Sequence, residues 1–223
     1  MKQFLLFFSL LLMTIAGRSQ DSKYALEITS VAGVSWFSSL SAIDSKLTAN
    51  SFPSLTNDLD LVQSGGGHFT FKIKRWGILA GGSTYNISSK ANANGHYYNG
   101  TSESYDLGVS YDVIQAKWFT FAPYFCLGEH NALIYLDYEF ANNVNPTSLR
   151  ITARESTCTF GGKCYFRVGA WKDYKWQLFI NGEVFYKLSV NGTWRFDDKL
   201  IDSEDFNLSN TSVMGGLSLR YSF

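Results

Sequence analysis

The chain has 223 residues, with 19 basic and 19 acidic side chains, 17% aromatic residues and a mean hydropathy of −0.08. This length suits one domain, and the mean hydropathy is too low for a bundle of membrane-spanning helices. The lack of a basic excess argues against a nucleic-acid partner.

Residues 1–19 have the features of a secretory signal peptide. Lys2 precedes a nearly unbroken apolar run over residues 4–15, which is shorter than the ~20 residues that a membrane-spanning helix needs. The small residues Ala16 and Gly17 suit a cleavage site, and we place the cut after Ser19; a retained anchor is the alternative. The predicted mature domain covers 20–223. It has no other apolar run of membrane-spanning length, so it would enter a membrane only as a closed barrel.

Apolar and polar residues alternate with a period of two along most of the mature chain, which is the pattern of strands with one apolar face. The clearest case is 176–188, where Trp176 and Ile180 share one face and Gln177 and Glu183 the other. Over 77–88 the pattern does not settle which residues share a face. The predicted strands cover residues 23–37, 64–74, 77–88, 103–114, 118–138, 149–169, 176–188 and 211–223.

The connections between these eight strands alternate in length. They are short after the second, fourth and sixth strands, whereas longer polar loops cover 38–63, 89–102, 141–146 and 189–208. Short periplasmic turns, long external loops and an even number of strands are typical of outer-membrane barrels. Four tryptophans beside the short turns fit an aromatic girdle at one membrane interface: Trp76, Trp118, Trp171 and Trp176. The sequence therefore predicts an all-β, eight-stranded antiparallel up-and-down transmembrane barrel in a Gram-negative outer membrane, with both termini on the periplasmic side.

The final predicted strand ends on alternating apolar residues, Leu219, Tyr221 and Phe223. It resembles the closing strand of outer-membrane barrels, in which the terminal aromatic residue belongs to the signal read by the barrel-insertion machinery. That resemblance implies the insertion machinery as a partner. The alternative is an edge strand of a soluble sandwich.

The mature chain as a whole resembles small outer-membrane barrels of the Bacteroidetes, the PorT-like or outer membrane protein beta-barrel group. The resemblance rests on the Ser19/Gln20 leader end, on the Leu-Arg-Tyr-Ser-Phe ending, and on paired glycines such as Gly215-Gly216. It implies a fold and a compartment, and little about activity.

Charged residues occupy the polar phase of the predicted strands and would face the lumen. Eight strands enclose a space that side chains can fill. An unpaired buried charge is costly, so we expect the carboxylates to meet lysine or arginine across the lumen, with His68 nearby. A proton path or a narrow channel is the alternative. The predicted luminal charge network consists of Glu27, Lys72, Lys74, Asp106, Asp112, Lys163, Arg167, Glu183, Lys187 and Arg220.

No catalytic, cofactor-binding or metal-binding residues are predicted. His96 and His130 fall in or near the expected external loops, and no spacing links them to a nucleophile, although His130 follows Glu129 and His96 precedes Ser102. The three cysteines are expected to be buried free thiols, because residues six apart on one strand lie beyond disulfide reach. A hairpin bridge between the second and third of them is the alternative. They are Cys126, Cys158 and Cys164.

The predicted function is a membrane scaffold that displays extracellular loops and has no open pore. Its expected partners are outer-membrane lipid, the insertion machinery and an unidentified extracellular or periplasmic protein, without a cofactor. One alternative is a soluble, secreted, lipocalin-like barrel whose apolar rows line a ligand cavity. A second alternative is a lipid-modifying outer-membrane enzyme.

Overall fold

The computed structural model describes residues 23–37, 62–88, 96–138, 149–196, 199–201 and 208–223. The predicted signal peptide, the predicted loop over 141–146 and most of the loop over 38–63 lie outside these residues. No helix in the described part is long and apolar enough to cross a membrane, a finding that does not concern strands.

All the regular structure in the described residues is β-strand. Two short strands lie beside longer ones: β5 (Ile114–Gln115) pairs with β6, and β9 (Lys199–Ile201) pairs with β8. The eight long strands are β1 (Tyr24–Phe37), β2 (Val62–Ile73), β3 (Trp76–Ser88), β4 (His96–Tyr111), β6 (Phe119–Tyr138), β7 (Leu149–Trp171), β8 (Trp176–Phe196) and β10 (Asn210–Ser222).

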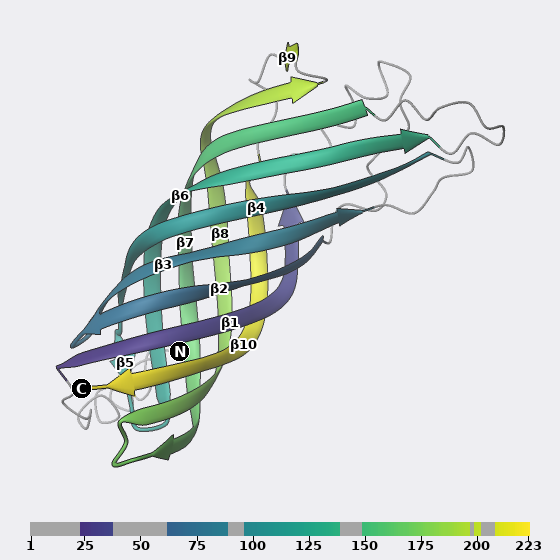
Figure 1. Cartoon of the computed structure of the whole chain (residues 1–223). Helices are drawn as coiled ribbons and strands as arrows, with labels where there is room; N and C mark the ends of the chain where they lie inside the picture. The colour runs from purple at the N-terminus through teal and green to yellow at the C-terminus, as the bar shows by residue number, and fades with distance from the viewer. Residues whose placement is uncertain (1–22, 38–61, 89–95, 139–148, 197–198, 202–207) are drawn as a thin grey trace, which may run out of the picture.

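These eight long strands form one closed ring in which consecutive strands are antiparallel neighbours. The order is β10-β1-β2-β3-β4-β6-β7-β8, and β10 also pairs with β8, which closes the sheet. The start of β1 and the end of β10 lie side by side at one end (Figure 1), where the amide of Phe223 donates to the carbonyl of Tyr24 at 3.0 Å. The predicted eight-stranded up-and-down barrel is confirmed.

Several strands extend further than the sequence predicted. β4 begins at His96, within the predicted loop over 89–102, and β8 runs to Phe196, within the predicted loop over 189–208. Both extensions are paired: Asn99 lies opposite Tyr135, and Gly192 opposite Glu155. The strands are longer because backbone hydrogen bonds to a neighbour hold a segment extended whatever the polarity of its side chains.

The outer face of the ring carries the apolar rows. Inside, Glu27 and Lys187 are fully buried, so the polar rows face the lumen. This is the reverse of the lipocalin-like alternative, which requires apolar rows inside. Each of the eight ring strands exposes a large apolar side chain by 48–63%, and together these residues define the apolar belt: Ile28, Phe69, Ile78, Leu107, Leu127, Phe160, Ile180 and Leu217.

Inward-facing glycines permit close approach between neighbouring strands. A Cβ atom added to Gly108 would lie 2.1 Å from the carbonyl oxygen of Phe125, and one added to Gly216 would lie 1.8 Å from that of Ser30. Glycine inside a strand marks sharp bends and close backbone approaches. The strong bending of the long strands around the barrel is visible in Figure 1.

The four tryptophans border the short connections. Trp76 follows the β2–β3 turn, Trp118 precedes β6, and Trp171 and Trp176 flank the β7–β8 turn. The first three are 60%, 57% and 44% exposed, and the rings of Trp171 and Trp176 stack with centroids 6.4 Å apart. They therefore form an outward-facing aromatic cluster at the short-turn end of the barrel.

Candidate functional site

The polar interior of the barrel begins, near the short turns, with two ion pairs. Arg220 on β10 donates through Nε to Glu27 on β1 at 2.8 Å. Lys72 on β2 donates to both oxygens of Asp112, at 2.7 and 2.8 Å. The ring of Phe179 lies under the Arg220 guanidinium at 4.5 Å. These four charges are nearly or fully buried, and each cation meets a carboxylate.

A second cluster lies further along the lumen around Glu183, which is 1% exposed. Tyr124 donates a hydrogen bond to Glu183, and His68 Nε2 lies 3.3 Å from its second carboxylate oxygen. Lys163 Nζ is 4.0 Å from the same oxygen and 4.9 Å from the centre of the Tyr124 ring. One carboxylate is thus shared by a lysine, a histidine and a phenol.

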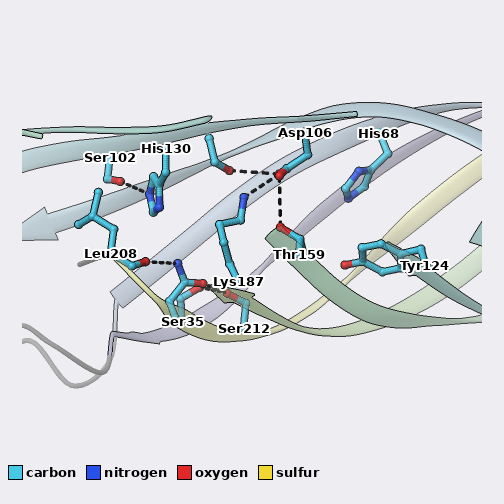
Figure 2. A network of polar contacts seen from close by, with 12 residues as sticks. Ser35, His68, Ser102, Asp106, Tyr124, His130, Thr159, Lys187, Leu208 and Ser212 are labelled. Atoms are coloured by element: carbon cyan, nitrogen blue, oxygen red, sulfur yellow. Dashed lines mark hydrogen bonds and ion pairs between the residues drawn. The ribbon is translucent and has the colours of Figure 1, made fainter. Parts of the chain in front are cut away.

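A third cluster is centred on Asp106 of β4. Figure 2 shows Lys187 and Thr159 both directed at this carboxylate. Lys187 Nζ donates at 2.7 Å and Thr159 Oγ1 at 3.2 Å. Lys187 comes from β8, on another part of the ring, so the ion pair crosses the lumen.

The loop-side end of the lumen holds a buried serine–histidine pair. His130 is fully buried on β6, whereas the sequence placed it in or near an external loop; the strand passes through this position and turns the ring inward. Its Nε2 hydrogen-bonds with Ser102 of β4, as Figure 2 shows. Within the described residues Nδ1 has no hydrogen-bond partner. Ser102 is also fully buried, so solvent does not reach the pair in the described structure, and no acid among the described residues orients the imidazole.

Glu155 of β7 is a luminal carboxylate that sequence reasoning missed. It is 2% exposed and accepts hydrogen bonds from Trp194 Nε1 at 2.7 Å and from the Leu208 amide at 2.8 Å, as well as from Ser189. Glu155 and Lys163 lie an even number of residues apart on β7, so both side chains point to the same face of the sheet. The alternation in the sequence could therefore have predicted that Glu155 faces the lumen. Tyr124 was not predicted either, because it carries no charge and its role as a donor to Glu183 depends on the closed ring.

Two predicted members of the charge network do not pair across the lumen. Lys74 is exposed in the β2–β3 turn, and Arg167 is half-buried near the end of β7, with its guanidinium 5.5 Å from the Tyr174 ring. Both line a cavity at the short-turn mouth. The other eight residues form the pairs and the Glu183 cluster described above.

The three residues of the predicted insertion signal lie on the outer face at the same end. Leu219 and Tyr221 are half-buried, and Phe223 is 54% exposed. Tyr221 packs against Trp176, with centroids 4.6 Å apart, and Phe223 stacks on Tyr24 at 5.9 Å. Tyr221 thus contacts the aromatic cluster through Trp176, and the part of all three residues in insertion stays a prediction.

The cysteines are all free thiols: Cys126 is buried, while Cys158 and Cys164 are half-buried on β7. The alternative hairpin bridge is therefore absent. No group of three or more histidine, cysteine or acidic side chains among the described residues is placed to hold a metal ion.

The fold is similar to solved outer-membrane barrels. A major outer membrane protein from Thermus thermophilus superposes with a TM-score of 0.58 at 11% identity, over 89% of this chain and 99% of that one. The attachment invasion locus protein Ail of Yersinia pestis gives a TM-score of 0.48 at 8% identity, over 91% and 100%. Neisserial surface protein A gives 0.42 at 11%, over 91% and 98%. No protein-family model and no curated protein sequence matches the chain.

Proposed function

We propose that the protein is an integral outer-membrane β-barrel that acts as a scaffold for extracellular loops. The observation that carries this proposal is the apolar belt, which places an exposed large apolar side chain on every ring strand, while paired charges pack with polar and apolar side chains in the interior. Exposing so much apolar surface to water is unfavourable, whereas hydrocarbon accepts it. The fold shared with outer-membrane proteins supports the same compartment.

The proposed lumen is closed to ions. Four cations and four carboxylates meet in buried contacts: Lys72 with Asp112, Arg220 with Glu27, Lys187 with Asp106, and Lys163 with Glu183. Paired charges and tyrosine rings occupy a space that eight strands leave only wide enough for side chains. The serine–histidine pair is buried and has no acid partner among the described residues, which supports a barrel without a catalytic role.

Cell fractionation tests the membrane location. We expect the protein to stay with outer-membrane vesicles through alkaline carbonate and urea washes, and to require detergent for extraction. Release of the protein by either wash would contradict the proposed membrane location. Planar-bilayer recording of the purified protein then tests the closed lumen, for which the expected result is no stepwise conductance; reproducible steps would contradict it.

We also propose a narrower assignment among the outer-membrane barrels. The paired glycines and the alternating residues Leu219, Tyr221 and Phe223 support a barrel of the Bacteroidetes PorT-like group that is inserted by the barrel-assembly machinery. The aromatic cluster at the short turns supports a periplasmic position for that end. An F223A variant should accumulate in the periplasm, and a variant with unchanged outer-membrane yield would count against the insertion role.

A further inference from the structure

The short-turn mouth of the barrel holds a cavity of about 270 Å³. Among the residues that the structure describes, five basic side chains line it and no carboxylate does. They come from the end of β2 and the turn after it, from the connection before β6, from β7 and from β10. The basic residues are Lys72, Lys74, Lys117, Arg167 and Arg220.

The positive charge of this mouth is only partly balanced. Lys72 and Arg220 are paired with Asp112 and Glu27, which are fully buried and do not line the cavity. Lys74, Lys117 and Arg167 have no ion pair in the described part of the chain. Three cations without an ion pair among the described residues therefore line one concave site, and a partly enclosed site strengthens their field compared with open solvent.

One of these lysines, Lys74, lies in the tight turn between β2 and β3. Its φ is 55°, in the left-handed region that favours glycine or asparagine. Its amide donates to the carbonyl of Lys23 at 2.9 Å. A two-residue hairpin turn commonly requires this conformation, so the tight pairing of β2 with β3 sets the backbone of Lys74. Arg167 likewise sits at a register shift between β7 and β8.

We propose that this mouth binds a phosphate group. An arginine can bind two phosphate oxygens at once and lysines add point charges, and Thr120 and Gln177 add polar side chains to the lining of the cavity. The cavity is smaller than the roughly 300–1,000 Å³ of drug-sized sites, which suits a small phosphate ester or a lipid headgroup. The lipid source rests on the proposed membrane location, and the free ester does not.

The test uses the full chain folded in an uncharged detergent, titrated calorimetrically with inorganic phosphate at low ionic strength. We expect saturable binding at one site. The R167Q and K74Q variants should each weaken it at least about tenfold. K175Q is the matched control, because Lys175 is an exposed cation of the β7–β8 turn that does not line the cavity. Folded electrophoretic migration of each variant excludes misfolding as the cause of a loss.

A second arm separates the two phosphate sources. The protein is reconstituted in phosphatidylcholine vesicles with or without phosphatidylglycerol, and phosphate binding and lipid retained after detergent extraction are measured. Phosphate binding that persists with phosphatidylglycerol present supports a free ester. Retained phosphatidylglycerol that depends on Arg167 supports a lipid headgroup. Neither saturable phosphate binding nor Arg167-dependent lipid retention, or equal losses in R167Q and K175Q, would overturn the proposal while leaving the membrane location intact.

Discussion

Glu27 and Arg220 lie directly opposite each other on β1 and β10, the first and last strands of the ring. Their ion pair, with Arg220 Nη2 2.6 Å from Glu27 Oε2, bridges the seam at which the sheet closes. Both side chains are almost completely buried. The hydrogen bond joins two residues that are 193 positions apart in the sequence.

Replacing one residue of this pair should destabilise the barrel more than replacing both residues together. Glu27→Leu or Arg220→Met alone leaves an uncompensated buried charge, which we expect to cost about 3–5 kcal/mol in the free energy of unfolding. The double variant should lose less than the sum of the two, by at least about 1 kcal/mol. Denaturant unfolding in lipid vesicles measures this, and additive losses would show that the two side chains do not interact.

The exposed pair Glu129 and Arg154 provides the comparison for that cycle. Arg154 Nη2 lies 2.7 Å from Glu129 Oε2 on the outer face, with the two side chains 72% and 38% exposed, respectively. Water and salt screen such a contact. The corresponding Glu129→Leu and Arg154→Met variants should leave the unfolding free energy nearly unchanged.

A charge placed in the apolar belt should hinder membrane integration. Ile180 is 51% exposed on β8, and Ile180→Arg should cost about 2–4 kcal/mol in a bilayer if it lies near the midplane. Thr193→Arg, at an exposed polar position further along the same strand, is the control and should integrate normally. The folded fraction in vesicles is the measurement. Equal integration of both variants would mean that the belt does not face lipid.

The close approach of β4 and β6 should make Gly108 intolerant of a side chain. Gly108→Ala places a methyl group against the carbonyl oxygen of Phe125, and the strands must shift at a cost of about 1–3 kcal/mol. Gly182→Ala is the matched control, because nothing lies within 4 Å of its added Cβ atom. Urea unfolding of both variants checks the difference, and an equally stable Gly108→Ala protein would refute the close approach.

Thiol counting tests the state of the cysteines. The structure shows Cys126, Cys158 and Cys164 as free, so the denatured, non-reduced protein should give three reactive thiols per chain. A count of one would indicate a disulfide. In the folded protein Cys126 should react most slowly, since it is buried inside the lumen.

Much of the fold follows from local pattern. The alternation in 176–188 places Ile180 and Glu183 on opposite faces, because successive side chains in a strand point to opposite sides of the sheet. The short connections beside Trp76 and Trp171 predict antiparallel neighbours and hence an up-and-down ring. The strand limits were harder, since the polar start of β4 is held by its partner β6 and not by its own residues.

Partner choice inside the lumen depended on the closed ring. The sequence by itself determined that Asp106 and Lys187 face inward and that a buried charge needs a counter-charge. Only the tertiary structure decided that these two meet, and that Arg167 remains at the mouth without a carboxylate partner among the described residues. The physical reason is that a period of two specifies the face of a strand, whereas height and angle around the lumen are set by register, bulges and closure, which are properties of all the strands together.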